Sequence, residues 1–415
     1  MSQMTHASPL LFGKMKKLWI IILAVVVALG VGGYFAWRHI ANEREEQGHF
    51  QRSETKLIVA NLAHVPVELL KAGKDLEGNK PVGGFDGEST WLGQGNYFIQ
   101  AQFPNGTALY PVPVTGYRSG PDQDGLFTLT IRSLPLEQPP RALATASDFA
   151  FIPPGHLLLG DRLNPREPHF VWLPEFFVSL FEVSNSEFKT FVEASDGYRD
   201  DQNWTEEGRR WKSGNTCHAT ALIKPTDEDY ARFGQDDQPV VLVNWFEADS
   251  YCRWLSRKYG KGVWIFSLPS EAEWEKAARG PDNFDYALGS SVSDQEVSLY
   301  NWKKNPTAEV TVIGSKLSRE KFVPNRYGLY HMTGNVSEWT GTLNRPYNRE
   351  HPYADDDRNR SDLTGTRVVR GGSWYTASTA VLYIPYRETF PPEVSTPYLG
   401  FRVVARRLPL HFAKD

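Results

Sequence analysis

The sequence predicts an α+β protein in which a small β-sandwich and one N-terminal transmembrane helix precede a loop-rich C-terminal domain. The 415 residues include 34 Gly and 28 Pro, and 13% of the chain is aromatic. This composition favours irregular segments that are held in place by aromatic side chains. Short alternating apolar runs fill the N-terminal third of the chain, whereas capped helical patterns begin only after residue 180.

Residues 18–37 are predicted to form the transmembrane helix. The segment LWIIILAVVVALGVGGYFAW contains no charged residue and is long enough to cross the hydrocarbon core of a bilayer. Lys14, Lys16 and Lys17 precede it, so the positive-inside rule places the N-terminus in the cytoplasm. We therefore expect a single-pass protein of the bacterial inner membrane with periplasmic C-terminal domains. A cleaved signal peptide is the alternative, although the segment lacks a clear A-x-A site.

The segment from 54 to 135 is predicted to be the small β-sandwich. Its alternating runs KLIVANL, NYFIQAQF and LFTLTIRSL are separated by stretches rich in Gly and Asp. That pattern is typical of antiparallel strands joined by hairpins. No group of side chains in it suggests catalysis, so we interpret this part as a spacer or docking module.

The C-terminal domain is predicted to contain three capped helices. The first follows FFVSLFEV, with Ser184 or Asn185 as the N-cap. The second follows the strand-like PVVLVNW, and the third begins at Ser270, where Glu273 is placed to complete a capping box. Loops and short strands are expected to fill the rest of the domain.

The charge balance argues against a nucleic-acid partner. The chain contains 45 Lys and Arg and 49 Asp and Glu, which gives a formal net charge of -4. Basic residues are interspersed with acidic ones, so no continuous basic surface is predicted.

The third predicted helix carries three acidic residues in alternate positions: Glu271, Glu273 and Glu275. One of them is expected to form a buried ion pair with Arg279 or Arg402. We expect Arg370 and Arg402 to donate hydrogen bonds to loop carbonyls. The two cysteines leave two interpretations open: Cys217 and Cys252 pair in an oxidising compartment, or Cys252 stays free in its apolar helix.

Six segments in fixed order carry a resemblance to a known family. They are FEVSNSEF at 181–188, PVVLVNWFEADSYCRWLS at 239–256, SLPSEAEWEKAARG at 267–280, NRYGLYHMTGNVSEW at 325–339, RVVRGGSW at 367–374 and LGFRVVA at 399–405. This set resembles the formylglycine-generating enzyme, or sulfatase-modifying factor, family. The resemblance implies a loop-rich fold related to C-type lectins.

With that resemblance, the expected organisation has seven segments. They are the cytoplasmic N-terminus (1–17), the transmembrane helix (18–37), a linker (38–53), the small β-sandwich (54–135), a second linker (136–149), the formylglycine-generating-enzyme-like domain (150–407) and a C-terminal tail (408–415).

The resemblance also implies a copper site that this sequence does not keep. In the oxidases of the family, two cysteines after "GGS" bind copper and oxidise a substrate cysteine. The serine of that motif falls on Ser373, the first cysteine position on Thr376 and the second on Val381. Cu(I) prefers thiolates, so a hydroxyl is a poor ligand and an isopropyl group is none. We therefore expect no copper and a degenerate site without catalytic residues, which favours the absence of enzymatic activity without deciding it.

The sequence allows two interpretations of the loop around Glu338, with and without a calcium ion. The resemblance implies a calcium loop formed by the carbonyls of Gly334 and Val336 and by the Glu338 carboxylate, which suits a hard cation that binds oxygen. The side-chain ligand that Asn usually supplies falls on His331. The alternative is a tight turn in which Glu338 accepts backbone N–H groups without a metal.

Two functions follow from these observations. The first is a membrane-anchored periplasmic protein whose degenerate sulfatase-modifying-factor domain binds a protein partner, as an assembly or accessory subunit of a membrane or exported complex. The alternative is a periplasmic oxidoreductase or maturation factor that modifies a protein side chain without the usual cysteine pair.

Overall fold

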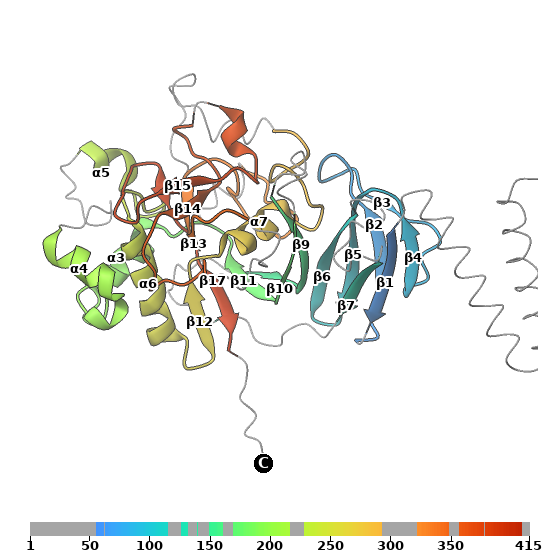
Figure 1. Cartoon of the computed structure of the whole chain (residues 1–415), viewed down its shortest axis with the longest axis horizontal. Coiled ribbons are helices and arrows are strands. Elements are labelled where there is room, and N and C mark those ends of the chain that lie inside the picture. Colours follow the sequence, from blue (N-terminus) through green and yellow to red (C-terminus); the bar gives the residue numbers. More distant parts are fainter. Residues whose placement is uncertain are drawn as a thin grey trace, which may run out of the picture.

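The computed structural model describes ten stretches of the chain (Figure 1): residues 55–61, 63–114, 126–131, 139, 149–160, 169–215, 228–292, 322–347, 357–376 and 378–408. They form an N-terminal module over residues 55–131 and a larger C-terminal domain over residues 149–408. The predicted transmembrane helix at 18–37 lies outside these stretches. Among the residues that are described, no helix is long and apolar enough to cross a membrane.

The N-terminal module consists of two sheets that share one hydrophobic core. The first sheet has the order β4-β1-β7, with β1 at Thr55–Asn61, β4 at Ser89–Leu92 and β7 at Leu126–Ile131. The second has the order β3-β2-β5-β6, with β2 at Val67–Lys71, β3 at Lys80–Pro81, β5 at Gly95–Phe103 and β6 at Gly106–Val114. Leu57, Ile99, Tyr110 and Phe127 are buried together between the sheets. The alternation in sequence therefore marks the inward face of each strand.

One strand pair departs from the antiparallel pattern that the sequence predicts. Strands β1 and β7 run parallel, in a register from Lys56 opposite Leu126 to Asn61 opposite Ile131. Parallel neighbours need a crossover connection. Here strands β2 to β6 lie between them in the chain. The chain therefore passes through the second sheet before β7 pairs with β1 in the first.

The C-terminal domain contains a hairpin and two four-stranded sheets (Figure 1). The hairpin pairs β9 at Gly155–Leu159 with β10 at His169–Leu173. One sheet has the order β12-β17-β11-β8, with β8 at Phe149–Ile152, β11 at Phe176–Ser179, β12 at Trp264–Ser267 and β17 at Val404–Arg407. The other has the order β15-β14-β13-β16, with β13 at Ser337–Leu343, β14 at Arg367–Arg370, β15 at Glu388–Phe390 and β16 at Leu399–Gly400. Strand β17, the last one in the described part of the chain, is central in its sheet, so this sheet forms only when the segment at Val404–Arg407 is in place.

Each of the three predicted helices begins at a side-chain cap. Helix α3 (Asn185–Glu193) is capped by Ser184, helix α6 (Trp245–Tyr259) by Asn244 and helix α7 (Glu271–Arg279) by Ser270. In all three, the carboxylate of a glutamate at the third helical position accepts a hydrogen bond from the backbone N–H of the N-cap residue. The capping box predicted for Ser270 and Glu273 is thus confirmed, and at the first helix Ser184 rather than Asn185 is the cap.

Four further helices complete the described part of the domain. They are η1 at Asp201–Asn203, α4 at Glu206–Gly214, α5 at Glu228–Phe233 and η3 at Thr379–Leu382. An aromatic core surrounds helix α6, in which Trp245, Tyr251 and Trp254 are almost fully buried. This core packs α6 against strands β12 and β13.

The N-terminal module packs directly on the C-terminal domain, where β6 lies beside β9 (Figure 1). The Tyr327 hydroxyl donates to the carbonyl of Leu109 at 3.1 Å, and the Arg326 guanidinium donates to the carbonyl of Leu76 at 2.6 Å. The same guanidinium lies 5.5 Å from the ring centroid of Phe98. These contacts combine apolar, cation–π and hydrogen-bonding terms, so they define the orientation of the module on the domain.

Helix α7 carries the acidic side chains singled out in the sequence. Glu275 pairs with Arg279 at 2.9 Å, as predicted, and also with Arg370 at 2.7 Å. The other predicted partner, Arg402, binds Glu338 instead. Arg370 donates to the carbonyl of Ile384 and Arg402 to that of Tyr330, which confirms their expected contacts with loop carbonyls.

A buried lysine on α7 makes folding stability depend on pH. Lys276 is 1% exposed, and its Nζ donates to the carbonyls of Pro153 at 2.7 Å and Gly155 at 3.0 Å. Burial lowers the pKa of Lys276 to about 7, against the opposing charge of Glu273. A neutral amine has two N–H donors, and two carbonyls accept them here.

We predict that the free energy of unfolding rises from about pH 7 to about pH 10.5 more steeply in the wild type than in Lys276→Met. In this window only the unfolded state holds the lysine proton, so folding gains about 1.4 kcal/mol per pH unit. Below pH 7 both states hold the proton and the full cost of burying the charge is present. Urea unfolding at a series of pH values measures the two slopes. The exposed Lys189→Met variant is the control and should follow the wild type; equal slopes for wild type and Lys276→Met would contradict the assignment.

Candidate functional site

The candidate site is built on the turn that follows β14. Gly371 and Gly372 adopt φ angles of 95° and 65°, a region that favours glycine. A Cβ atom on Gly372 would lie 3.1 Å from the carbonyl oxygen of Val381 and 3.0 Å from Leu382. Gly372 therefore allows helix η3 to pack directly against the turn, whereas Gly371 leaves room for the ring of Trp274.

The structure brings Ser373 and Thr376 together. The backbone N–H of Ser373 donates to the Thr376 hydroxyl, and the N–H of Thr376 donates to the Ser373 carbonyl, both at 3.0 Å. The two hydroxyl oxygens are 3.5 Å apart. Val381 lies on η3, the segment that packs against Gly372. The Thr376 hydroxyl thus closes a local turn at the position where the resemblance expects a thiolate.

Neither cysteine supplies a thiolate in the described part of this site. Cys252 is a free thiol in the core around α6 and is 1% exposed. Burial raises the pKa of this thiol well above its ordinary value, and the charge of Asp249 raises it further. Cys217 lies outside the described residues. The free thiol of Cys252 agrees with the second of the two interpretations that the sequence left open. A buried thiol of this kind packs as a small apolar side chain.

Beside Thr376 lies a group of aromatic residues that we call the aromatic ledge, formed by Trp374, Tyr375 and Tyr398. Tyr375 is 43% exposed, and its ring stacks on that of Tyr398 at 5.0 Å with an interplanar angle of 6°. Trp374 is buried beneath them against Phe233, and the Arg232 guanidinium lies 4.7 Å from the Trp374 ring centroid. The ledge therefore offers a flat π surface with a cation nearby, which suits a ligand with apolar or planar groups.

The loop before β13 holds the glycine turn through backbone hydrogen bonds. The Gly334 N–H donates to the Gly371 carbonyl at 2.9 Å, and the Trp374 N–H donates to the Asn335 carbonyl at 2.8 Å. Asn335 in turn donates from its side chain to Glu182 at 2.9 Å. The candidate site therefore depends on buried polar groups that the copper motif does not include.

The residues predicted as calcium ligands are close together, but their carboxylate has other partners. Glu338 accepts hydrogen bonds from Arg402 at 2.7 Å and from the Trp274 indole at 2.8 Å. Burial raises the pKa of the Glu338 carboxyl, and the nearby charge of Glu182 adds to this, whereas Arg402 opposes it. In the portion of the chain that is described, no three His, Cys, Asp or Glu side chains are grouped as a metal site would require.

Glu182 is the buried carboxylate that the sequence did not single out. Burial alone would raise its pKa, but the charge and hydrogen bond of His331 and the charge of Arg402 bring it below the ordinary value. His331 Nδ1 lies 3.2 Å from Glu182 Oε2. The available signal was a glutamate between two apolar residues in FEV, which predicts a paired, buried acid.

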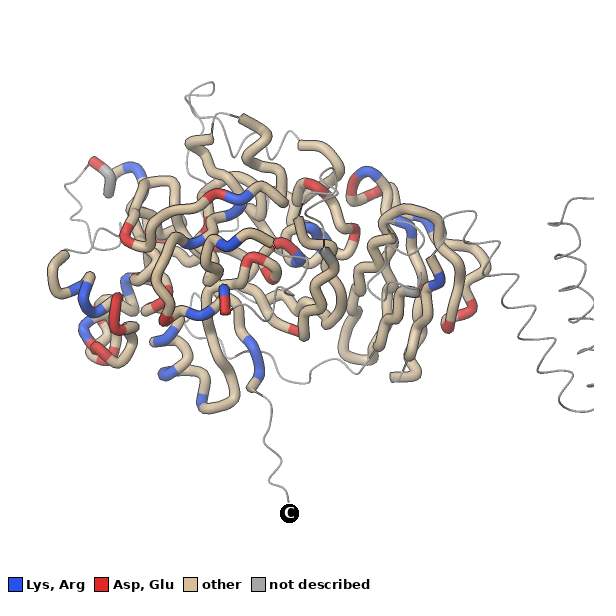
Figure 2. The backbone as a smooth tube through the Cα atoms, in the orientation of Figure 1, with Lys and Arg blue, Asp and Glu red and all other residues tan. Residues whose placement is uncertain are grey.

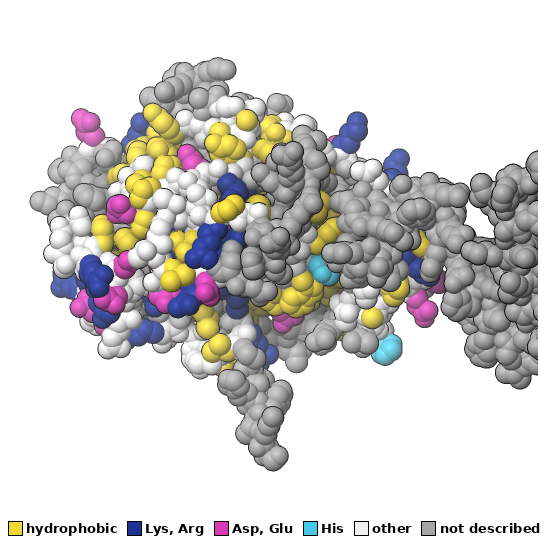
Figure 3. Space-filling model, in the orientation of Figure 1, with side chains coloured by type: hydrophobic (Ala, Val, Ile, Leu, Met, Phe, Trp, Pro, Cys, Tyr) yellow, Lys and Arg dark blue, Asp and Glu magenta, His cyan; other side chains and the backbone are white. Residues whose placement is uncertain are grey.

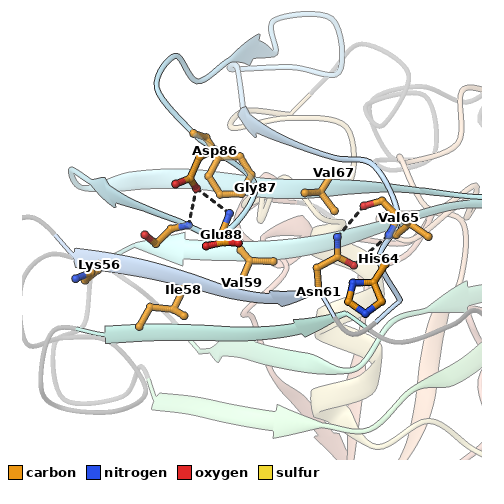
Figure 4. A pocket seen from close by; sticks show the side chains of 12 residues that line it. Lys56, Ile58, Val59, Asn61, His64, Val65, Val67, Asp86, Gly87 and Glu88 are labelled. Carbon is orange, nitrogen blue, oxygen red and sulfur yellow. Dashed lines mark hydrogen bonds between the residues drawn. The ribbon is translucent and has the colours of Figure 1, made fainter.

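A hollow of about 840 Å³ lies on the N-terminal module, where β1 faces the loop around Asp86 (Figure 4). Its polar groups serve the local backbone. The Asp86 carboxylate accepts the N–H groups of Glu88 at 2.8 Å and Ser89 at 2.9 Å, which lower the pKa of Asp86. Asn61 bridges to the backbone of Val65. These side chains shape loops and do not converge on a common point, so the hollow has no catalytic arrangement.

A second hollow of about 430 Å³ lies between β10 and the first turns of α6 and α7. Trp172 and Trp245 line its apolar side. Its charged groups are paired within the protein: Asp249 with Arg253 at 2.7 Å, and Glu273 with Arg406. Pairing leaves no uncompensated charge there to attract an ionic substrate.

The outer surface has no extended region of one charge among the residues described. Figure 2 shows basic and acidic positions interspersed over both parts of the chain. On the face shown in Figure 3, acidic and basic side chains lie next to one another, with apolar side chains scattered between them. The aromatic ledge is accordingly the main chemical feature beside the predicted site.

Comparisons with known proteins agree with the sequence motifs. The domain model described as "Sulfatase-modifying factor enzyme 1-like domain" matches residues 136–407. The chain is 28% identical over 253 residues to the hercynine oxygenase of Mycobacterium tuberculosis, covering 58% of this chain and 55% of that protein. It is 28% identical over 268 residues to the formylglycine-generating enzyme of Mus musculus, covering 56% of this chain and 67% of that protein.

Two further relatives differ more in length or structure. A serine/threonine-protein kinase pkn1 of Chlamydia caviae is 27% identical over 271 residues, which cover 64% of this chain and 39% of the kinase. The chain thus spans well under half of the kinase and about half of the hercynine oxygenase. The structure of PvdO from Pseudomonas aeruginosa aligns with 65% of this chain and 97% of that chain, at 20% identity and a TM-score of 0.46. Because the domain model matches well over half of the residues, the chain belongs to the sulfatase-modifying factor enzyme 1-like family.

Proposed function

We propose that the chain is a membrane-anchored periplasmic protein whose sulfatase-modifying-factor domain binds a protein partner instead of oxidising one. The observation that carries the proposal is the hydrogen bond that the Thr376 side chain makes within the turn. Its hydroxyl accepts the N–H of Ser373 to close a turn at the position where the resemblance to the family's copper oxidases places a thiolate. Val381, at the other such position, offers only an aliphatic side chain. Without two thiolates, Cu(I) has no soft ligands here.

The aromatic ledge supports a binding role for the same place. Tyr375 and Tyr398 present stacked rings next to the former ligand positions, with Trp374 below them and Arg232 at the side. Exposed aromatic groups on a rigid support are typical of protein and peptide recognition. The turn that carries them is held by backbone hydrogen bonds to the Gly334–Asn335 segment, so little ordering is needed on binding. A protein segment that lies extended over the ledge is the ligand we propose.

The membrane anchor and the N-terminal module extend this proposal. We propose that residues 18–37 span the inner membrane and that the module links the anchor to the binding domain. The contacts of Arg326 and Tyr327 with the module support this role, because they define one orientation between the two parts. A fixed orientation suits an accessory subunit of a membrane or exported complex.

An enzymatic function is the second candidate, and the names of the relatives favour it. Two of them are a formylglycine-generating enzyme and a hercynine oxygenase. Those activities belong to those proteins, and this chain spans about half of the second. Under this alternative, the domain would modify a protein side chain with groups other than the cysteine pair.

We predict that Tyr375→Ala weakens binding of the partner about tenfold, or about 1.4 kcal/mol, because it removes the exposed half of the ledge. The partner would first be identified by crosslinking in gently solubilised membranes, and binding of the purified proteins would then be measured by calorimetry. Tyr375→Phe should retain most of the affinity. Trp172→Ala removes an aromatic side chain that is 56% exposed on β10 and is the matched control. Equal affinities for wild type and Tyr375→Ala would contradict the proposed ledge.

We also predict that the wild type does not bind Cu(I) at this turn and that Thr376→Cys/Val381→Cys gains affinity of at least about tenfold, because it restores two soft ligands. Competition with a chromogenic Cu(I) chelator measures the affinity. The variant Ser378→Cys/Thr379→Cys has the same number of added thiols at neighbouring positions and should bind less tightly. Copper-dependent loss of a thiol from cysteine peptides incubated with the wild type, seen by mass spectrometry, would favour the enzymatic alternative.

A further inference from the structure

The loop from His331 to Glu338 is where the family resemblance places a calcium ion, and its donor set does not fit one. Calcium takes six to eight oxygen ligands, and a carboxylate is normally among them. Both oxygens of Glu338 already accept hydrogen bonds from Arg402, at 2.7 to 2.9 Å, and one also accepts the Trp274 indole N–H. An ion at this carboxylate would have to displace a fully buried guanidinium.

Arg402 is not free to move aside. Besides Glu338, it donates to the carbonyls of Ser179 at 3.1 Å and Tyr330 at 3.0 Å. Its side chain has no exposed surface. Displacing it would leave a buried positive charge and several buried carbonyls without their hydrogen bonds, a cost of several kcal/mol.

At the remaining ligand position, the imidazole of His331 pairs with a carboxylate instead of presenting an oxygen atom to a cation. Its Nδ1 lies 3.2 Å from Glu182 Oε2, and both side chains are fully buried. The rings of Phe181, Phe322 and Tyr330 surround the imidazole at centroid distances of 5.7, 5.3 and 6.2 Å. An apolar enclosure of this kind excludes the water molecules that usually complete the coordination shell of a hard cation.

The contact between His331 and Glu182 also supports the candidate site. Glu182 accepts the Asn335 amide at 2.9 Å, and the Asn335 carbonyl accepts the N–H of Trp374 in the ledge. His331 has a φ of 56°, a conformation that a residue with a side chain adopts only where the surroundings hold it. The pair therefore stabilises a strained loop at the point where that loop holds the ledge.

We propose that the His331–Glu182 pair replaces the calcium ion of this loop, so that the chain holds its glycine turn and aromatic ledge without a metal. His331, Glu182 and Asn335 are positioning residues for the ledge. The proposal concerns how the loop is held and stands whether the ledge binds a partner or takes part in an altered reaction.

The test uses the purified full-length chain. Thermal unfolding is followed by circular dichroism after chelation with EDTA and again with excess CaCl2, and hydrogen–deuterium exchange of residues 331–338 is measured under both conditions. We expect the wild-type Tm to differ by less than about 1 °C and exchange in the loop to be unchanged. Slower exchange of this loop with calcium would overturn the proposal. A calcium effect on Tm without a change in this loop arises at another place and leaves the proposal standing.

A double-mutant cycle tests the pair itself in EDTA. His331→Asn and Glu182→Gln should each lower the Tm, and the double variant should lower it by less than the sum, because both changes act on one contact. The exposed pair Lys189 and Glu193 on α3, which are 3.9 Å apart, provides a control cycle with small and additive shifts. Additive shifts for His331→Asn and Glu182→Gln would overturn the assignment. If Glu182→Gln does not fold, the exchange measurement on the wild type still decides.

Discussion

The fold of the C-terminal domain depends on the buried guanidinium of Arg402. It lies between β16 and β17 and donates to Glu338 on β13, to the carbonyl of Ser179 on β11 and to the carbonyl of Tyr330 in the loop before β13. A single side chain thereby connects both four-stranded sheets and the loop behind the candidate site. Burying it is costly, and the cost is offset only because a carboxylate and several carbonyls are aligned with its planar donors. Removing the Glu338 carboxylate would leave the guanidinium without its closest charged partner in the core.

A second arginine holds the other side of the site. Arg370 ends β14 immediately before the two glycines and pairs with Glu275 at 2.7 Å, while it also donates to the carbonyls of Ile384 and Tyr386. Those carbonyls belong to the segment that follows η3. The turn is therefore held from behind by the Gly334–Asn335 loop and from the side by Arg370. Both supports hydrogen-bond to backbone groups, and the Thr376 hydroxyl adds a third contact by accepting the N–H of Ser373.

Local features of the sequence predicted much of this. Capping residues at Ser184 and Ser270, the contacts of Arg370 with loop carbonyls, and the pair of Glu275 with Arg279 follow from spacing and from the rule that buried charges are paired. The parallel β1–β7 pair could not be predicted, because the pattern of alternation is the same in both strand directions. The partner of Arg402 was assigned to α7 because nothing in the sequence specifies which of several buried acids lies opposite a given arginine. Glu182 and the stacking of Tyr375 on Tyr398 were missed for the same reason: each is defined by contacts between segments that are far apart in the chain.

The residues that support the turn are different from those that would carry out a reaction there, and this explains why family membership leaves function open. Thr376 and Val381 are half-buried. Thr376 lies on a turn that is held by two glycines, by backbone hydrogen bonds, by Arg370 and by its own hydroxyl, and Val381 lies on η3 beside it. Exchange of cysteine at either position alters little of the packing that stabilises the domain, whereas the buried ionic groups cannot be exchanged singly. The family motifs of this chain therefore include residues that build the support, such as Gly371, Gly372 and Arg402. Only the few side chains that project from the support can distinguish an oxidase from a binding module.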